Sequence, residues 1–155
     1  MASGFMFPAM AREFRRGGIQ FAAIFSYDML RTAPMNLGWQ THFFNMVFTP
    51  SKAVSSMIAA EVMRRIPRGK HFGYYPDNRT FDDFRVSYDE QLSELNSGDM
   101  FYYSNTTSTR PKNLAALKHI AGVGSSPVVR YSGTGIYFLD KQDDNTWQLE
   151  IYPDI

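Results

Sequence analysis

GGIQFAAIFSYD, residues 17–28, is the stretch on which the predicted fold of this chain depends. A glycine pair is followed by a run that is almost entirely apolar, and the run ends at Tyr27 and Asp28. A strand with one face in water alternates apolar and polar side chains, whereas a strand covered on both faces is continuously apolar. We therefore predict a strand over residues 19–25 that is buried on both faces and leads into Tyr27 and Asp28.

Helices are predicted before and after this strand. Residues 7–16 place apolar side chains at helical spacing, and Gly17 ends the pattern. Residues 49–66 repeat apolar side chains at the same spacing, with Thr49 suited to the N-cap and Pro50 to the first turn. Each predicted helix therefore has an apolar face with which to cover a sheet.

A second largely apolar segment, residues 42–48, is predicted to be another strand. The order is then helix, strand, loop, strand, helix, which favours a parallel sheet with helices outside it. Two strands alone would leave both edges unpaired and their faces incompletely covered. We therefore expect residues 1–68 to be the end of a longer α/β unit.

The second half of the sequence is predicted to be mainly β. Residues 69–79 form a connector rich in Pro, Gly and aromatic residues, and residues 80–155 are rich in β-forming segments and turn signals. Strands are predicted within 84–89, 100–105, 126–132, 136–141 and 146–152, the last two as a hairpin. The remaining stretches 105–113, 122–127 and 133–135 are predicted to be loops and turns.

Composition excludes several functional classes. Sixteen Lys and Arg against 15 Asp and Glu give a net charge of +1, which is not the basic footprint of a nucleic-acid-binding protein. The sequence has no cysteine, and no acid stands at metal-ligand spacing from a histidine. We also find neither a signal-peptide pattern nor an apolar run of membrane-spanning length. We therefore expect no nucleic-acid partner, no membrane partner, no metal and no cofactor.

Five segments together resemble large, secreted glycoside hydrolase-like proteins of Bacteroidetes-type bacteria: REFRRGGIQFAAIFSYD, QTHFFNMVFTPSKAVSSMIAAEVMRRIP, FRVSYDEQLSELNS, YYSNTTSTRPKNLAALKHIAGVGSSPVV and GTGIYFLDKQDDNTWQLEIYPD. In that family the last strands and helices of a (β/α)8 barrel run into a small C-terminal β-domain. The resemblance covers nearly the whole chain and implies a secreted or periplasmic parent protein.

The resemblance implies an α/β fold followed by a mainly β one. Residues 1–68 would be the last two βα units of a TIM-type barrel, with 19–25 as its seventh strand and 42–48 as its eighth. Residues 69–79 would be a connector, and residues 80–155 a small β-sandwich-like domain. The chain would then be a fragment whose partners are a carbohydrate and the N-terminal barrel segments of the parent.

A glycoside hydrolase normally needs two carboxyl groups that flank the scissile bond. Asp28 is the acid at the two predicted strand ends and their following loops, so the sequence lacks a complete pair. In related barrels one catalytic Glu comes from the fourth strand, which this chain lacks, and another ends the seventh, where this chain has FSYD. We expect the parent to act on O-glycosidic bonds of a polysaccharide or oligosaccharide and this chain alone not to be catalytic. The alternative is a non-catalytic carbohydrate-binding or scaffolding module.

Catalytic and substrate-binding side chains of a barrel lie at the carboxyl ends of its strands. The predicted substrate-binding residues are therefore Tyr27, Asp28, Trp39, Gln40 and His42. Aromatic faces such as those of Tyr27 and Trp39 stack on sugar rings, and polar neighbours bind the hydroxyls. The alternatives are structural: Asp28 would cap a helix or pair with Arg31, Trp39 would pack under its own loop, and His42 would be a hydrogen-bonded residue at a strand start.

Overall fold

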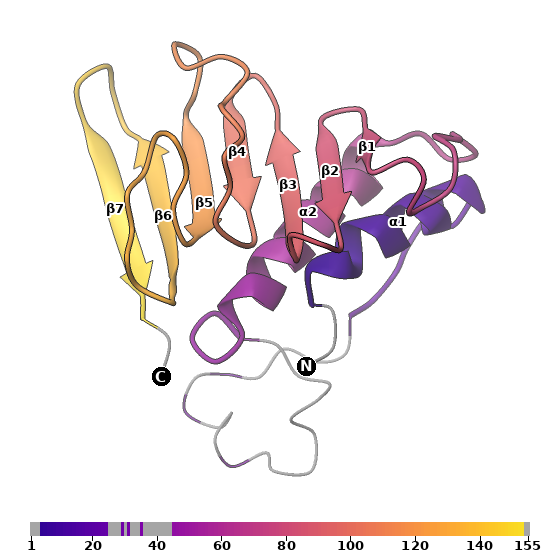
Figure 1. Ribbon diagram of the computed structural model, residues 1–155, viewed down its shortest axis with the longest axis horizontal. Helices are drawn as coiled ribbons and strands as arrows, with labels where there is room; N and C mark the ends of the chain where they lie inside the picture. The colour runs from indigo at the N-terminus through magenta and orange to yellow at the C-terminus, as the bar shows by residue number, and fades with distance from the viewer. Residues whose placement is uncertain (1–3, 25–28, 30, 32–34, 36–44, 154–155) are drawn as a thin grey trace.

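The structure is a computed structural model that describes residues 4–24, 29, 31, 35 and 45–153. It contains two α-helices and one seven-stranded sheet, so the fold is mixed α and β and mostly β (Figure 1). The elements in chain order are the 3-10 turn η1 (Gly4–Met6), α1 (Phe7–Arg16), α2 (Pro50–Arg65), β1 (Thr80–Phe81), β2 (Phe84–Ser87), β3 (Leu92–Asn96), β4 (Met100–Tyr103), β5 (His119–Val123), β6 (Ile136–Lys141) and β7 (Trp147–Tyr152).

The strands follow one another across the sheet in sequence order, from β1 to β7. Neighbours are antiparallel except for β4 and β5, which are parallel. Two adjacent parallel strands cannot be joined by a tight turn. Residues 104–118 therefore form a long connection that returns from the end of β4 to the start of β5. This connection covers one face of the sheet, and the helices cover the other (Figure 1).

The helices and the sheet share one apolar core. Val54, Ile58 and Val62 lie on one face of α2 and are fully buried, as are Phe84 and Val86 on β2. These side chains form a cluster with residues of α1, β3 and β6. The period-two pattern of β2 directs alternate side chains to this core, and the helical spacing of α2 supplies the matching apolar face.

A second apolar cluster lies on the opposite face of the sheet, under the connecting loops. Its buried members are Leu92, Phe101, Tyr103, Leu117, Ile120 and Tyr137. Gly122 on β5 lies among them, and a Cβ at this position would stand 2.5 Å from the Tyr103 ring and 2.6 Å from the Tyr137 hydroxyl. Only glycine allows β5 to pass so close to these two rings.

Several local predictions are confirmed. Helix α1 spans 7–16 as predicted, and α2 begins at Pro50. Thr49 occupies the N-cap position, although its hydroxyl donates a 3.0 Å hydrogen bond to the Asn45 carbonyl and makes no capping bond to the helix. The sequence also correctly predicted the positions of strands β2 and β4, the hairpin of β6 and β7, and the loop at 105–113.

The predicted strand over 19–25 is wrong for its described part. Residues 19–24 form no strand and are exposed. Gly18 adopts φ +80°, and the Ile19 amide donates a 2.9 Å bond to the Phe14 carbonyl, so the chain turns back from the end of α1. All strands of the described sheet come from residues 80–152, and none of them is paired with residues 19–24. Residue 25 lies outside the described residues.

The predicted strand over 42–48 is also wrong where it can be compared. Residues 46–48 form a turn, and 42–44 lie outside the described part of the chain. The buried Asn45 side chain accepts hydrogen bonds from the amides of Val47, at 2.7 Å, and Phe48, at 3.2 Å. An asparagine that binds the backbone ahead of it in this way stabilises a turn instead of a strand.

A third correction concerns the second half. Residues 126–132 were expected to contain a strand but form none, whereas β5 lies earlier, at His119–Val123. The Ser126 hydroxyl accepts a 3.2 Å bond from the Val129 amide, which closes a turn there. The seven strands belong to a single sheet, and the end of a TIM-type barrel is not seen among the described residues. The division at 69–79 stays a prediction, although α1 and α2 pack on the sheet.

Candidate functional site

The five predicted substrate-binding residues, Tyr27, Asp28, Trp39, Gln40 and His42, all lie outside the described residues. Their grouping at one end of two strands therefore stays a prediction. The part of the chain that the structure describes offers two other features of functional interest. One is an apolar pocket beside the helices, and the other is a buried polar network on the sheet.

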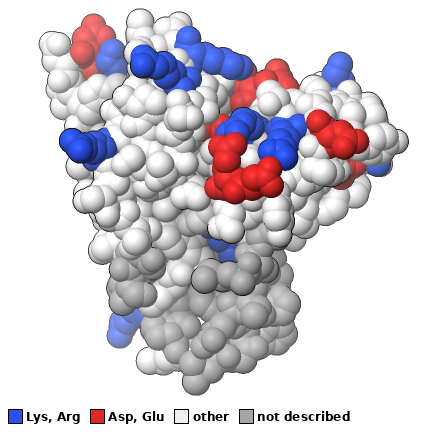
Figure 2. Space-filling view, in the orientation of Figure 1, with Lys and Arg blue, Asp and Glu red and all other residues white. Residues whose placement is uncertain are grey.

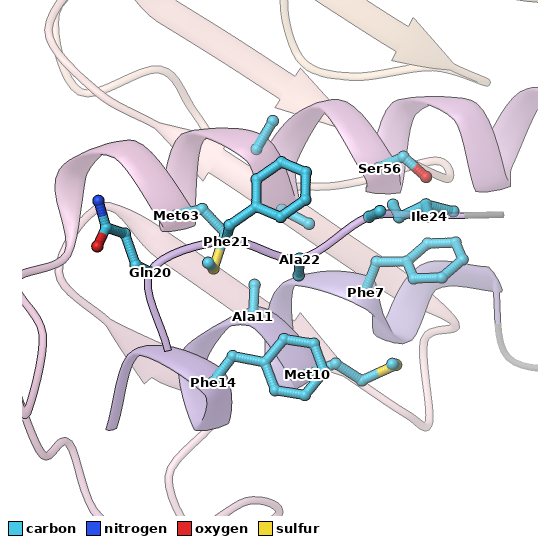
Figure 3. A pocket seen from close by; sticks show the side chains of 13 residues that line it. Phe7, Met10, Ala11, Phe14, Gln20, Phe21, Ala22, Ile24, Ser56 and Met63 are labelled. Atoms are coloured by element: carbon cyan, nitrogen blue, oxygen red, sulfur yellow. The ribbon is translucent and has the colours of Figure 1, made fainter. Parts of the chain in front are cut away.

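The apolar pocket lies between α1 and α2 and has a volume of about 450 Å³. Phe7, Met10 and Phe14 line it from α1, and Ala59 and Met63 line it from α2. Residues 20–24 run along the pocket between the two helices (Figure 3). The pocket therefore lies on the side of the helices that does not pack on the sheet.

The pocket has few polar groups. Among its described lining residues, Gln20 and Ser56 carry polar side-chain groups. The Ser56 hydroxyl already donates a 2.9 Å hydrogen bond to the Lys52 carbonyl within α2. Sugar sites need several convergent polar groups that fix the hydroxyls of the ligand. This pocket therefore suits apolar side chains better than a carbohydrate.

The surface around the pocket is exposed and apolar. Phe21 is 79% exposed, and Met10, Ile19 and Ile24 are exposed as well. Scattered apolar side chains are normal on a protein surface, but a contiguous patch marks a surface that contacts something else. We name the exposed apolar surface formed by α1, α2 and residues 19–24 the helix-face patch.

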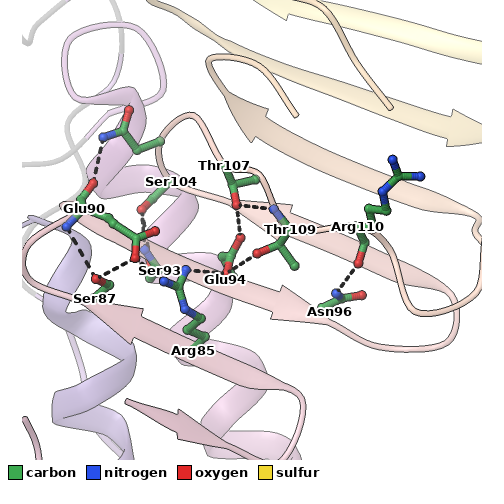
Figure 4. A network of polar contacts seen from close by, with 11 residues as sticks. Arg85, Ser87, Glu90, Ser93, Glu94, Asn96, Ser104, Thr107, Thr109 and Arg110 are labelled. Carbon is green, nitrogen blue, oxygen red and sulfur yellow. Dashed lines mark hydrogen bonds and ion pairs between the residues drawn. The ribbon is translucent and has the colours of Figure 1, made fainter. Parts of the chain in front are cut away.

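The polar network is centred on Glu94 of β3 (Figure 4), and this residue is only 1% exposed. Its carboxylate accepts hydrogen bonds from the Thr107 hydroxyl and, at 3.1 Å, from the Thr109 hydroxyl. It also pairs at 3.0 Å with the Arg85 guanidinium, which reaches it from the neighbouring strand β2. The guanidinium binds Glu90 as well, and this hydrogen bond holds the pKa of Glu90 below its ordinary value.

The arrangement around Glu94 is structural. Its oxygens are occupied by two hydroxyls and a guanidinium, so they are not free to accept a substrate proton. The next inward-facing residue, Asn96, binds the same loop through a 2.9 Å bond to the Arg110 carbonyl and a 2.9 Å bond from the Lys112 amide. The network therefore fastens the connection at 104–118 to the sheet.

A pair of buried tyrosines extends this polar layer. The Tyr137 hydroxyl donates a 2.9 Å bond to the Gly124 carbonyl, and the Tyr103 and Ser126 hydroxyls are hydrogen-bonded to each other at 3.0 Å. The two tyrosine hydroxyls also bind each other. Burial raises the pKa of both tyrosines, so both are neutral donors at physiological pH.

His119 and Asp140 form an accessible pair of a histidine and a carboxylate on the sheet. The His119 Nδ1 atom lies 2.7 Å from an Asp140 carboxylate oxygen, and both side chains are about half exposed. The pair stands on neighbouring strands β5 and β6. No cluster of three or more His, Cys, Asp or Glu residues able to hold a metal occurs in residues 4–24, 29, 31, 35 and 45–153.

Sequence reasoning missed both the helix-face patch and the Glu94 network. The signal for Glu94 is an acid in the middle of a segment, LSELN, that is otherwise free of charge. An acid buried in a strand needs donors nearby, and Thr107 and Thr109 follow in the loop after the next strand. The helix-face patch could also have been found from the sequence, because the apolar run at 19–24 predicts that this segment contacts another apolar surface.

Comparison of the chain with protein-family models, with curated proteins and with solved structures finds no match. Neither described helix is long and apolar enough to cross a membrane.

Proposed function

We propose that this chain is the C-terminal portion of a glycoside hydrolase-like protein that acts on O-glycosidic bonds of a polysaccharide or oligosaccharide. Within it, the described sheet and helices have a scaffolding role and brace the catalytic barrel. The single observation that carries the proposal is the helix-face patch. The resemblance of five sequence segments to that family supplies the identity of the partner.

The two helices present apolar side chains on two sides. On one side Val54, Ile58 and Val62 pack on the sheet. On the other side Met10, Phe14 and Met63 line the pocket beside residues 20–24. A helix that is apolar on both sides is typical of an element packed between two layers. The sheet is the first layer, and we propose that further barrel segments of the parent are the second.

The same proposal accounts for the continuous apolar character of residues 19–24. Their exposure is unfavourable by roughly 25 cal/mol per Å² of apolar surface that a neighbouring strand would otherwise cover. Residues 19–24 form no strand in this structure, and they would become the seventh strand that the resemblance implies only by pairing with barrel strands of the parent. Tyr27, Asp28, Trp39, Gln40 and His42 would then face the sugar cleft from the carboxyl ends of the strands.

The described acids do not support catalysis by this chain alone. Hydrolysis of a glycosidic bond needs two carboxyl groups about 5 to 10 Å apart on either side of the sugar. Glu94 is the fully buried acid of the sheet and is neutralised by Arg85. A scaffolding role is therefore favoured for the sheet, and the carboxylates for hydrolysis would come from elsewhere in the parent.

A carbohydrate-binding role is the second candidate, and an exposed aromatic side chain of the connector before β1 favours it. Tyr74 is exposed, and the Arg16 guanidinium carbon lies 5.0 Å from the centre of its ring. The His71 ring lies edge-on to it at a centroid distance of 5.2 Å. An aromatic face beside polar donors is a common way to bind a pyranose.

The deciding experiment is to sequence the DNA upstream of the Met1 codon and translate it in the same frame. The proposal expects an open frame of several βα units with carboxylates at strand ends. A stop codon shortly before Met1 would contradict it. Glycan-array binding by the purified chain that is lost in Tyr74→Ala would favour the second candidate instead.

A further inference from the structure

Strand β7 is the outermost strand of the described sheet, beyond β6. It is exposed along almost its whole length, and its apolar residues Trp147, Leu149 and Ile151 are 39%, 56% and 49% exposed. Natural proteins protect such edges with lysine, proline, a bulge or a covering loop. The sequence of β7, WQLEIY, contains one charge and neither lysine nor proline. This edge is therefore open to pairing with another strand.

The hydrogen-bond pattern shows which backbone groups of β7 face the open edge. Beside the hairpin turn the Gln142 amide donates a 2.9 Å bond to the Thr146 carbonyl. Hydrogen-bonded pairs alternate along an antiparallel ladder, so the residues of β7 bonded to β6 are Gln148, Glu150 and Tyr152. Consistent with this, the Lys141 amide points away from β7 and donates to the Lys118 carbonyl. The amides and carbonyls of residues 147, 149 and 151 therefore point outward.

The outward-facing backbone and the apolar side chains belong to the same three residues. Trp147, Leu149 and Ile151 alternate along the strand, so their side chains share one face of the sheet. Their partners on β6 include Leu139 and Tyr137, which belong to the apolar cluster under the loops. In Figure 2 acidic and basic side chains lie at the top left, over the β6–β7 hairpin turn, and the surface below them is mostly white. Within the described part of the chain, this edge thus combines outward-facing backbone amides and carbonyls with an apolar strip.

We propose that β7 pairs with β7 of a second copy of this chain, antiparallel and about a two-fold axis at Leu149. In this register Leu149 lies opposite Leu149 of the copy, and Trp147 lies opposite Ile151. All three outward-facing residues of one strand then meet outward-facing residues of the other. An aromatic residue opposite a β-branched one is a favourable cross-strand pair.

Charge selects this register over its neighbours. With the axis at Leu149, Glu150 lies opposite Gln148 of the copy, and an amide can donate to a carboxylate. A shift that places Leu149 opposite Ile151 would bring Glu150 opposite itself, and like charges directly opposed are destabilising. The opposite shift places Trp147 opposite Leu149 and takes Ile151 beyond the partner strand. The edge is therefore complementary to itself in one register.

The pairing would join the two sheets into one continuous sheet. Each of the three hydrogen-bonded pairs contributes two bonds, so about six backbone bonds form, together with burial of the apolar strip on both strands. This is a small interface, at the low end of specific protein contacts. With a net charge of only +1 per chain, repulsion between the copies is weak. We expect a reversible dimer with a Kd on the order of 10 µM.

A cysteine cross-link tests the register directly, because the chain has no cysteine of its own. In a hydrogen-bonded antiparallel pair the Cα atoms stand about 5.5 Å apart, which a disulfide spans. Leu149→Cys should form a covalent dimer under mild oxidation of the full chain. Asp144→Cys is the control, because the Asp144 side chain is far more exposed but lies in the hairpin turn, away from the proposed axis. Equal cross-linking of both variants, or none at residue 149, would overturn the proposal.

Sedimentation equilibrium separates this contact from association through the helix-face patch. The native chain at about 100 µM should be largely dimeric, and Leu149→Lys should be at least ten-fold weaker in self-association. Gln148→Lys adds the same charge to the next residue, on the other face of the strand, where it would lie opposite Glu150 of the copy, so this variant should dimerise at least as tightly as the native chain. Circular dichroism should show both variants folded. A monomeric native chain, growth into open-ended oligomers, or dissociation by Phe21→Asp but not by Leu149→Lys would each contradict pairing through β7.

Discussion

The Arg12 guanidinium carbon lies 5.1 Å from the centre of the Phe81 ring, so α1 is joined to β1 by a cation–π contact. Arg12 is 1% exposed, and it also donates a 2.7 Å hydrogen bond to the Asn78 carbonyl. Phe81 in turn stacks on Phe84 of β2. One arginine therefore connects the first helix, the connector before β1 and the edge of the sheet.

Arg12→Ala should lower the free energy of unfolding by about 2 to 4 kcal/mol. The variant loses the aromatic contact and the packed side-chain stem, and it leaves the Asn78 carbonyl without this donor. Urea denaturation followed by circular dichroism measures the change. Arg16→Ala, at the exposed end of the same helix, is the control and should change stability by less than about 1 kcal/mol. Equal effects of the two substitutions would contradict this role of Arg12.

Glu94→Ala should destabilise the protein by about 2 to 4 kcal/mol. The substitution leaves two hydroxyls and one arm of Arg85 without their acceptor beneath the loop, and unpaired buried donors are unfavourable. Limited proteolysis should then cut within 104–113 faster than in the native chain. Glu90→Ala removes an acid that pairs with the same arginine but is half exposed, so its effect should be about 1 kcal/mol or less.

Gly122→Ala should destabilise the sheet by roughly 2 kcal/mol or more. The added Cβ would stand 2.5 Å from the Tyr103 ring, and overpacking of this kind typically costs 1 to 3 kcal/mol. Gly98→Ala is a matched control, because nothing lies within 4 Å of a Cβ there. Thermal unfolding of the two variants side by side checks the difference. A Tm for Gly122→Ala equal to that of Gly98→Ala would show that β5 does not pass as close to the rings as described.

Phe21→Ser should reduce binding of the dye ANS without reducing stability. Phe21 is among the most exposed apolar residues of the helix-face patch, so its removal subtracts apolar surface and no core contact. Phe84→Ser, at a fully buried position, should instead unfold much of the chain and increase dye binding. Unchanged dye fluorescence in Phe21→Ser would count against the patch as an exposed surface.

Stability should decline at alkaline pH because of Tyr103 and Tyr137. Burial raises the pKa of each phenol above the ordinary value of 10.0, so the folded state holds its protons more tightly than the unfolded state. The contribution of the pair is therefore complete below pH 10 and is lost as pH rises above it. Unfolding free energies measured from pH 8 to pH 11 should fall at the alkaline end. Tyr137→Phe should flatten that fall, and an unchanged slope would contradict the assignment.

Local signals in the sequence predicted the local structure. The helical spacing in 7–16, Pro50 at the start of α2 and the turn residues at 143–145 each act over a few positions, and the elements they indicate are present. The prediction of two barrel strands was wrong because a continuous apolar run indicates burial but does not show which element it packs against. Residues 19–24 lie beside helices, and Asn45 bends the chain with its own side chain.

Non-local features could not be predicted in the same way. HIAGV looks like the approach to a turn because of Gly122, yet the glycine is there because tyrosine rings of both neighbouring strands, β4 and β6, lie against β5 at this position. Glu94 likewise makes sense only once the loop that carries Thr107 and Thr109 is folded over it. The predicted site residues, from Tyr27 to His42, lie outside the described part of the chain and stay predictions.

The parallel pairing of β4 with β5 has a consequence for the order of folding. On either side of this pair the strands are neighbours in sequence, so β1 to β4 and β5 to β7 can each assemble through short-range contacts. Joining the two groups requires the long connection at 104–118 to lose its freedom, and loop closure of this kind is an entropic barrier. The seam between β4 and β5 should therefore form late and set the folding rate. The Glu94 network, which holds that connection in place, would then speed folding as well as slow unfolding.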